Sequence, residues 1–370
     1  MKTSFKIFEI WEIPIKLHLS FLVILPIFAW VFANTEYFFA SLESRYLAYG
    51  LGGLLAILFF LCILLHELGH SYVALKSGID ISSITLMIFG GVSSMDKPKE
   101  DSSIEMKLAL AGPLVSVVIG LVLIGTSFLL GLKLPPFRGS ELIIDVFIGW
   151  LGFINFVLAG FNLLPAFPMD GGRVLRAFLA KRMPYIEATE KAAGIGKAFA
   201  FGLGLLGFLS IGQGGFWFIL IASFIYFGAS EEEKATKISG ALANKVVSDL
   251  MTEEVISVDP EMSLSEVVQI IRKKKHMGYP VLEQGELVGL ITFKDIQDVP
   301  EKERDKTNVK EVMTKDLITV TPSYDAYEAL TKMSKNGVGR LPVIKDTQLT
   351  GILSRSDFTT AIQLGSLWGE

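Results

Sequence analysis

Residues 54–76 read LLAILFFLCILLHELGHSYVALK, an apolar run with two histidines and a glutamate in its second half. On a helix, His66 and His70 lie on one face, so both imidazoles can reach a single metal ion. Glu67 follows the first histidine and can act as a general base on water at that metal. Ionisable side chains are costly in a membrane span, and this cost favours a metal site over the alternative, in which these polar groups only pack against one another.

The composition divides the chain into a membrane part and a water-soluble part. Of the first 230 residues 31 are charged, about 13%, whereas 41 of the last 140 are charged, about 29%. The first part contains six apolar stretches that approach the ~20 residues of a spanning helix. They run roughly over 17–34, 49–75, 105–132, 142–166, 193–211 and 213–229. A short glycine-rich turn separates the last two, so a single re-entrant hairpin is the alternative for that pair.

Basic residues near the ends of these stretches predict the orientation of the chain. If the N-terminus is cytoplasmic, thirteen Lys and Arg residues lie on the cytoplasmic side and three on the other side. Cytoplasmic segments carry such an excess. We therefore expect a multi-pass protein of the plasma membrane, surrounded by the lipid bilayer, with both termini in the cytoplasm. The net charge of −4 gives no indication of a nucleic acid partner, which would require a basic patch.

A catalytic zinc ion needs a third protein ligand and an open coordination position. Apart from Glu67, the carboxylates embedded in the apolar part are chiefly Asp145, near the predicted outer end of its span, and Asp170, at the inner end and at the depth of the histidines. Prolines and glycines around Asp170 break the helix, and irregular backbone at membrane depth is tolerated only against protein or a watery cavity. We expect Asp170 to be the third ligand; the alternative is that it only caps the helix from Gly171 onward.

Three motifs in this order resemble the site-2 protease family of intramembrane zinc metalloproteases: HELGH at 66–70, AGPLVS at 111–116 and NLLPAFPMDGG at 162–172. The resemblance covers most of residues 1–230. It implies hydrolysis of peptide bonds within or near transmembrane segments of substrate proteins. The zinc ligands that it implies are His66, His70 and Asp170. It also implies Glu67 as the catalytic acid/base, and Asn162 as a residue that holds substrate or stabilises the developing oxyanion.

Residues 81–94, ISSITLMIFGGVSS, are rich in β-forming side chains and are interrupted at Gly90-Gly91. A peptide bond inside a helix hides its carbonyl, so a transmembrane substrate must unwind before it is attacked. We hypothesise a membrane-embedded strand or hairpin that pairs with the extended substrate by β-augmentation. An ordinary surface hairpin is the alternative. The small residues of the AGPLVS motif favour close helix packing over direct substrate contact.

The water-soluble part contains an internal repeat with an offset of 62 residues. Met251-Thr252 recurs as Met313-Thr314, and Pro280-Val281 recurs as Pro342-Val343. The pattern of glycine, two apolar residues, a hydroxyl and an aspartate occurs at 289–295 and again at 351–357. Two copies of this length are expected to pack as a pseudo-symmetric pair rather than as a solenoid.

This repeat resembles a tandem pair of CBS domains over about residues 245–365. The resemblance implies a sensor of an adenosyl ligand, in which the aspartate holds ribose hydroxyls and the Thr or Ser supports the phosphate region. The nucleotide-binding residues that it implies are Thr292, Asp295, Ser354 and Asp357. The alternative is a structural module that forms a homodimer, in which the two aspartates only stabilise helix N-termini.

Together these features predict a polytopic α-helical membrane domain of about six spans, with short membrane-associated β-strands, followed by a soluble α/β CBS pair. The predicted boundaries are 1–230 for the protease domain, 231–244 for a linker, and 245–305 and 306–366 for the CBS domains. The predicted function is intramembrane zinc proteolysis modulated by the CBS pair, with one Zn²⁺ and an adenine nucleotide as ligands. The alternative is a CBS-gated transporter or channel, which would show inverted repeats or paired broken helices.

Overall fold

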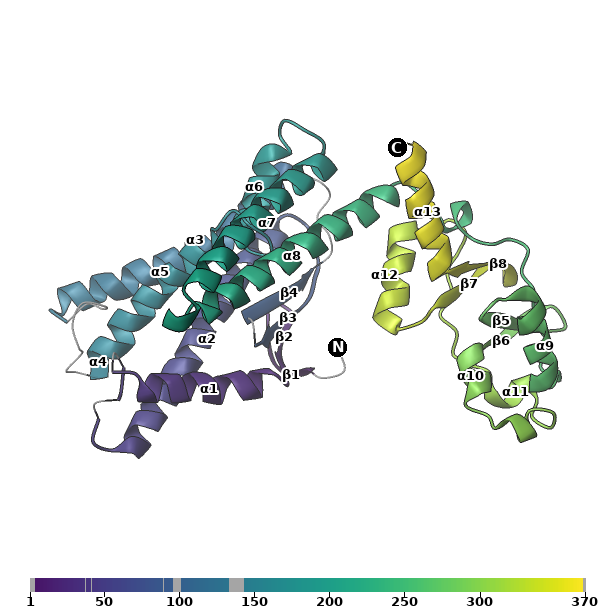
Figure 1. Ribbon diagram of the computed structural model, residues 1–370, viewed down its shortest axis with the longest axis horizontal. Helices are drawn as coiled ribbons and strands as arrows, with labels where there is room; N and C mark the ends of the chain where they lie inside the picture. The colour runs from purple at the N-terminus through teal and green to yellow at the C-terminus, as the bar shows by residue number, and fades with distance from the viewer. Residues whose placement is uncertain are drawn as a thin grey trace. The chain divides into compact units, whose positions relative to one another are not determined.

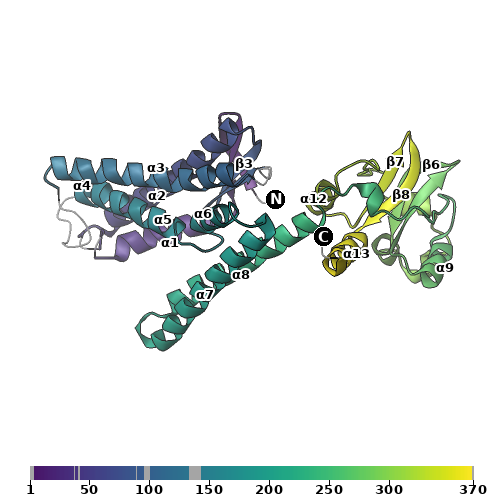
Figure 2. The same cartoon turned by 90° about the horizontal axis from the view of Figure 1, so that it is seen from above.

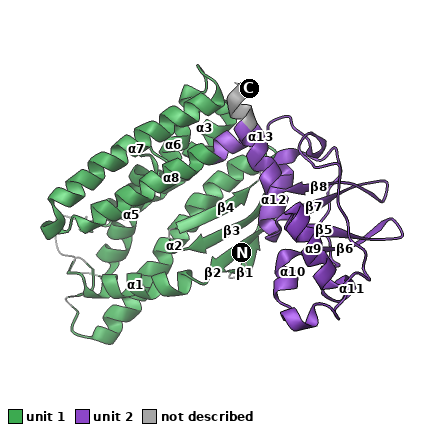
Figure 3. Ribbon diagram, turned by 45° about the vertical axis from the view of Figure 1, so that its right-hand side comes forward, with its two compact units in different colours: residues 1–234 green, residues 235–370 purple. Residues whose placement is uncertain are grey.

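The computed structural model describes residues 4–36, 38–40, 42–88, 90–95, 101–132 and 143–368. The chain forms two compact units, residues 1–234 and residues 235–370 (Figure 3). Some of the basic residues that predict the orientation lie outside the described ranges, namely Lys2, Lys97, Lys99, Lys133 and Arg138.

Unit 1 consists mainly of apolar helices (Figure 1). They are α1 (Phe21–Asn34), α2 (Arg45–Lys76), α3 (Ser102–Leu129), α4 (Ile143–Asp145), the π-helical turn Val146–Trp150, α5 (Leu151–Asn162), α6 (Asp170–Leu179), α7 (Tyr185–Leu209) and α8 (Phe216–Ala241). Within the described residues, four segments are long and apolar enough to cross a membrane: α2, α3, Ile143–Asn162 and α7. The predicted helical membrane fold is confirmed, whereas the count of about six spans is not.

Small residues bring the long helices close together. A Cβ atom at Gly52 would lie 2.6 Å from the carbonyl oxygen of Ala29 in α1, and one at Gly69 would lie 2.9 Å from the carbonyl oxygen of Ala111 in α3. Helix α2 therefore packs backbone to backbone on two neighbours, as small residues allow in membrane proteins. The close packing predicted for the AGPLVS motif is found at Ala111.

Helices α7 and α8 run side by side (Figure 1 and Figure 2). Ala200 of α7 and Ile225 of α8 share one apolar cluster. Helix α8 continues without a break through the acidic run 231–233 to Ala241, so most of the segment predicted as a linker is helical. Glu, Lys and Ala are good helix formers, and they carry the helix beyond its apolar part.

Four strands form one mixed sheet in unit 1. They are β1 (Ser4–Ile10), β2 (Ile13–His18), β3 (Ile81–Met87) and β4 (Gly90–Met95), in the order β1-β2-β3-β4. Residues 81–94 thus form the predicted hairpin, with Phe89 outside the described residues. Ile15 and Ile84 of the sheet share an apolar cluster with Leu64 and Leu68 of α2, so the sheet packs on the helix that carries the histidines.

Unit 2 contains two copies of one α/β repeat. The first has α9 (Leu264–Lys274), β5 (Gly278–Glu283), β6 (Glu286–Thr292), α10 (Phe293–Gln297) and the short helix Glu301–Glu303, whereas the short helix Val247–Asp249 packs on the core of the second repeat. The second has α11 (Val309–Val312), α12 (Ala326–Asn336), β7 (Arg340–Lys345), β8 (Gln348–Ser354) and α13 (Arg355–Trp368). Both hairpins have the same register, Val281 opposite Gly289 and Val343 opposite Gly351.

Each of the two repeats packs one methionine against the other repeat. A Cβ atom at Gly289 would lie 2.4 Å from Sδ of Met313, and one at Gly351 would lie 2.5 Å from Sδ of Met251. Each Met-Thr start therefore packs on the glycine of the other repeat, and the missing side chain provides the space. These reciprocal contacts confirm the predicted pseudo-symmetric pair. They also explain why the Met-Thr start and the glycine pattern recur at the same offset.

Candidate metal centre

Three side chains that are far apart in the sequence converge in unit 1. Nε2 of His66 lies 3.2 Å from Nε2 of His70, and Oδ2 of Asp170 lies 3.3 Å and 3.2 Å from these two atoms. All three residues are buried, and one ligand atom from each lies within 4.8 Å of the others. Two imidazole nitrogens and one carboxylate oxygen are a donor set that catalytic zinc uses.

Both imidazoles are held through their other nitrogen, and both partners lie on α3. Nδ1 of His70 donates to the carbonyl oxygen of Leu108 at 2.7 Å, and Nδ1 of His66 lies 2.9 Å from Oγ of Ser116. Such partners fix the tautomer and the ring orientation of metal-binding histidines. Both Nε2 atoms are thereby presented to the same point, as a metal ion would require.

Gly112 of α3 borders the point where the two imidazoles meet. A Cβ atom there would lie 2.2 Å from Nε2 of His70 and 2.6 Å from Nε2 of His66. Any larger side chain would occupy the space in front of these nitrogens. The donor set, the anchored rings and this free space together fit a zinc ion.

Asp170 is the first residue of α6, and the preceding Met169 is the N-cap residue, without a side-chain capping hydrogen bond. Cβ atoms at Gly171 would lie 2.3 Å from the carbonyl oxygens of Leu163 and Leu164, so glycine is needed where α6 starts against the end of α5. Oδ2 of Asp170 lies within hydrogen-bond range of both Nε2 atoms, so the carboxyl group is directed at the two imidazoles.

Glu67 lies beside strand β4, next to the three converging residues. Ser93 of β4 donates a hydrogen bond to Oε2 of Glu67 at 2.8 Å, and a Cβ atom at Gly91 would lie 2.3 Å from Cγ of Glu67. The strand thus rests on the glutamate side chain and fixes its position. A carboxylate fixed beside a metal centre has the placement of a general base.

Two other polar residues of the membrane part do not belong to the three that converge. Nδ2 of Asn162 donates to the carbonyl oxygen of Leu158 in its own helix at 2.9 Å. Asp145 is buried at the far end of the segment that ends at Asn162, about 25 Å away at 1.5 Å per residue. The histidines are joined by Asp170 and not by Asp145.

Several residues of the site were not predicted from the sequence. Leu108 acts through its backbone carbonyl, which leaves no signal in the residue type. Ser93 lies in the segment predicted to bind substrate, and no sequence feature connects it with Glu67. Gly112 and Ser116 belong to the AGPLVS motif and lie four residues apart, on one helix face. That spacing could have suggested a surface presented to the histidines in addition to helix packing.

The four residues predicted to bind a nucleotide form two matching side-chain pairs in unit 2, of which Thr292 and Asp295 make a complete capping box. Oδ2 of Asp295 accepts hydrogen bonds from N and Oγ1 of Thr292 at 2.8 and 2.7 Å. Oδ2 of Asp357 accepts from N and Oγ of Ser354, both at 2.7 Å. Each pair begins a helix, as expected if the aspartates only stabilise helix N-termini. In each pair the second carboxylate oxygen of the aspartate takes no part in these hydrogen bonds.

Arg340 lies between the two repeats, near one of these pairs. It is the partner of Ser354 in the β7–β8 hairpin, and its Nη1 would lie 3.0 Å from a Cβ atom at Gly278 of the first repeat. Burial lowers the pKa of the Arg340 guanidinium, and the nearby Tyr279 and Asp357 compensate this only in part. Oη of Tyr279 is buried, and no side chain among the described residues forms a hydrogen bond with it. The junction of the repeats therefore offers a cation and a hydroxyl that an anionic ligand could use.

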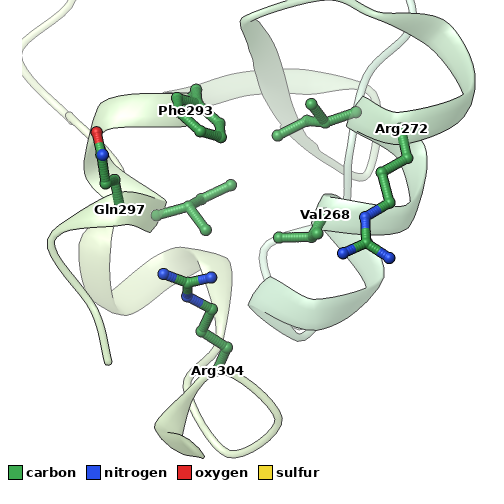
Figure 4. A pocket seen from close by; sticks show the side chains of 7 residues that line it. Val268, Arg272, Phe293, Gln297 and Arg304 are labelled. Atoms are coloured by element: carbon green, nitrogen blue, oxygen red, sulfur yellow. The ribbon is translucent and has the colours of Figure 1, made fainter. Parts of the chain in front are cut away.

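A separate cavity of about 220 Å³ lies on the helical side of the first repeat (Figure 4). Its walls include Phe293, Arg272 and Arg304, from α9, α10 and the turn after them. None of the residues predicted to bind a nucleotide lines it.

Two protein families match the chain. Residues 54–203 match the family described as Peptidase family M50, and residues 247–301 and 309–364 match the CBS domain. The first match contains all three converging residues and Glu67. The second covers both repeats of unit 2.

Proteins named as zinc metalloproteases are similar to the chain over almost its whole length. A zinc metalloprotease of Methanocaldococcus jannaschii is 38% identical over 372 residues, which cover 100% of this chain and 99% of that protein. A Mycobacterium tuberculosis protein named as a zinc metalloprotease is 30% identical over 382 residues, which cover 98% of this chain and 94% of that protein. A solved structure, the site-2 protease from Methanocaldococcus jannaschii, is 40% identical, with a TM-score of 0.44, and covers 62% of this chain and 95% of that chain.

Proposed function

Because the chain belongs to peptidase family M50, the site-2 proteases, we propose that His66, His70 and Asp170 are the ligands of its catalytic zinc ion. Members of this family are membrane-embedded zinc metalloproteases, so the chain hydrolyses peptide bonds within or near transmembrane segments of its substrates. This membership replaces the alternative of a CBS-gated transporter or channel. The observation that carries the ligand assignment is the buried triangle of two Nε2 atoms and one Oδ2 atom, with sides of 3.2 to 3.3 Å.

Glu67 is the catalytic acid/base in this proposal. When bound, zinc polarises the scissile carbonyl and makes a water molecule acidic enough to attack near neutral pH. Glu67 takes the proton of the attacking water and delivers it to the amide nitrogen as the C–N bond breaks. The hydrogen bond from Ser93 keeps the carboxylate turned toward the site. Asn162 stays the proposed residue for substrate or oxyanion contact; its bond to Leu158 uses one N–H of the amide, and the second N–H is the donor proposed for that contact.

Replacement of Glu67 by Gln tests this role. The amide keeps the shape and the hydrogen bond to Ser93 but cannot accept the proton, so cleavage of a membrane-spanning test substrate should fall by at least about 100-fold. Zinc should stay at one ion per chain, because Glu67 is not among the three ligands. Cleavage at the wild-type rate by Glu67→Gln would contradict the assignment of Glu67 as the catalytic acid/base.

The substrate segment is proposed to pair with β4. This strand is an edge of the four-stranded sheet and lies on Glu67 through Ser93 and Gly91. An extended chain that adds to such an edge receives its hydrogen bonds from the main chain and is held in the conformation that proteolysis needs. The carbonyl to be cleaved is thereby exposed next to the catalytic glutamate. The same contact makes an ordinary surface hairpin the weaker interpretation.

We also propose a multi-pass arrangement in the plasma membrane with cytoplasmic termini and about six spans. The 14-residue apolar helix α1 and the apolar first half of α8 would add to the four long helices. The excess of basic residues on one side supports the orientation. Labelling of single cysteines with a membrane-impermeant reagent checks it: equal reaction of Arg45→Cys and Lys181→Cys from the outside would contradict it.

The CBS pair is proposed to bind an adenine nucleotide and to regulate cleavage. Support comes from the partly buried Arg340 and the buried hydroxyl of Tyr279 at the junction of the repeats, beside Ser354 and Asp357. Arginine suits phosphate, and the free carboxylate oxygen of Asp357 suits ribose hydroxyls. The second pair, Thr292 and Asp295, has Gly278 in place of this arginine. We therefore assign the phosphate to the site at Ser354 and Asp357; a homodimer through the CBS domains is the remaining alternative.

A further inference from the structure

A buried arginine lies on α6, six residues after Asp170. The side chain of Arg176 is 6% exposed, and its Nε donates to Oε1 of Glu105 in α3 at 2.7 Å. Nη2 also donates to that oxygen, and Nη1 donates to Oε1 of Glu232 in α8 at 2.6 Å. Burial alone would lower the pKa of the guanidinium, but the two carboxylates outweigh this effect and raise it. Arg176 is therefore a permanent cation that joins three helices.

Two aromatic rings fix the plane of the guanidinium. Cζ of Arg176 lies 5.0 Å from the ring centre of Phe167 and 4.8 Å from that of Tyr185 in α7. Oη of Tyr185 also donates to Oε1 of Glu105 at 3.3 Å. A planar group held by ring faces and by directed hydrogen bonds cannot shift without losing several contacts together.

Stability alone is a weak reason for such a cluster. Removing charges from water is expensive, and well-packed apolar residues in place of a buried ion pair are often as stable or more stable. In addition, Oε2 of Glu105 is buried without a hydrogen-bond partner, which is a further cost. The contacts of Arg176 are better explained by the segments that they hold in place.

The partners of Arg176 lie on segments that carry the metal site. Glu105 precedes Leu108, the residue whose carbonyl orients His70, by one turn of α3. Phe167 belongs to the loop that leads into Asp170. The same loop contacts α8, since a Cβ atom at Gly228 would lie 2.5 Å from Cδ of Pro168. One side chain thus connects the helix that supports the histidines with the helix that begins at the aspartate.

We propose that Arg176 is a positioning residue for zinc binding, which holds the Asp170 end of α6 against α3 and so sets the place of Asp170 relative to the histidine pair. The inference rests on the ligand set proposed above. Metal–ligand distances are tolerated within about 0.2 Å, so a small slide of α6 along α3 would already misplace the carboxylate. The arm to Glu232 makes α8, the helix that continues into the CBS unit, part of the same frame.

The test is the zinc affinity of the purified full chain, measured in detergent by competition with a chelator. Arg176→Met should bind zinc about 10- to 100-fold more weakly, the usual loss for partners that orient metal ligands. Arg176→Lys, which keeps the charge but not the fork, should lie in between. Glu105→Gln is the second variant. It preserves the volume of the side chain but removes the charge that pairs with Arg176, and it tests the positioning role if Arg176→Met does not fold.

Lys197→Met is the matched control. Lys197 of α7 forms a partly buried ion pair with Glu233 of α8 at 2.6 Å, and its ammonium group also lies over the ring of Tyr226 in α8, so its polar contacts are with α8 and not with Glu105 or Phe167. This variant should lose thermal stability in EDTA while its zinc affinity stays within about twofold of the wild type, whereas a positioning residue moves both quantities.

Asp170→Asn separates the two levels of the proposal. If Asp170→Asn loses zinc while Arg176→Met and Glu105→Gln bind it within threefold of the wild type, the ligand set stands and the positioning role is overturned. If Asp170→Asn itself binds zinc like the wild type, both the ligand set and the positioning role fail. Weaker zinc binding by Asp170→Asn, Arg176→Met and Glu105→Gln, with Lys197→Met unchanged, is the expected result.

Discussion

Gly112 shows how strictly the metal centre limits its surroundings at the scale of one residue. Its missing side chain leaves the space in front of both Nε2 atoms, at 2.2 and 2.6 Å from an ideal Cβ position. The interior of α2 and α3 is closely packed, so an added methyl group must displace the imidazoles or the metal ion.

Replacement of Gly112 by Ala should therefore reduce zinc affinity about tenfold or more, although alanine is the better helix former. Gly125→Ala on the same helix is the control, because a Cβ atom there meets nothing within 4 Å. Chelator competition measures both variants. Equal zinc affinity of the two would show that the space at Gly112 is not needed by the metal.

The sequence predicted the converging residues themselves, because histidines and carboxylates in an apolar run are rare and their spacing carries the chemistry. It could not predict the groups that hold them. Leu108 contributes a carbonyl that every residue has, and Ser93 and Ser116 reach their partners only through tertiary contacts. Arg176 has no neighbour in the sequence that would indicate Glu105, 71 residues away.

At the scale of elements, the edge strand β4 is the feature that connects the fold with the substrate. β1 and β4 are the two edges of the sheet, and within the described residues the hydrogen bond to Glu67 comes from β4. Val92 of β4 and Ile7 of β1 are 44% and 48% exposed, so they report on the two edges at similar accessibility.

Single cysteines at these positions test β-augmentation, in a Cys62→Ala and Glu67→Gln background that keeps substrate uncleaved. A substrate with one cysteine near its cleavage site should form a disulfide with Val92→Cys and not with Ile7→Cys. Capture at both positions alike, or at neither, would contradict pairing at β4.

The hairpin at 81–94 was predicted because β-forming residues flank a glycine pair. Its place beside α2 was not, because the contact depends on Ile15 and Ile84 packing on Leu64 and Leu68. For α8, the apolar pattern ends near residue 229, whereas the helix continues to Ala241 on residues of high helix propensity. Hydropathy reports where a helix meets lipid rather than where it ends.

At the scale of the whole molecule, the chain combines a membrane protease with a CBS pair, and the two compact units meet at residues 234 and 235, within α8. The charge content of the sequence indicated this change from a membrane part to a water-soluble part. The repeat offset indicated the pair, and the reciprocal methionine contacts of the structure explain it. The position of Arg340 at the junction could not be predicted, since one copy has Gly278 where the other has the arginine.

An adenine nucleotide should bind the full chain and change its cleavage rate, and Arg340→Gln should weaken this binding about tenfold or more, because a hydrogen bond to a charged group contributes ~1.5–3 kcal/mol. Arg272→Gln is the control, an arginine of the same unit that lines the separate cavity. Fluorescence titration with AMP and ATP measures both variants. Equal affinities of the two variants, or no saturable binding below millimolar nucleotide, would favour the dimerisation module.

The central claim is that His66, His70 and Asp170 hold the catalytic zinc ion, and the zinc content of two isosteric variants tests it most directly. Asp170→Asn and Asp145→Asn each remove one buried carboxylate from the membrane part, but only Asp170 lies at the histidines. Elemental analysis of the purified chains should find about one zinc ion in the wild type and in Asp145→Asn, and little in Asp170→Asn. A full zinc ion in Asp170→Asn, or its loss from Asp145→Asn alone, would contradict the account.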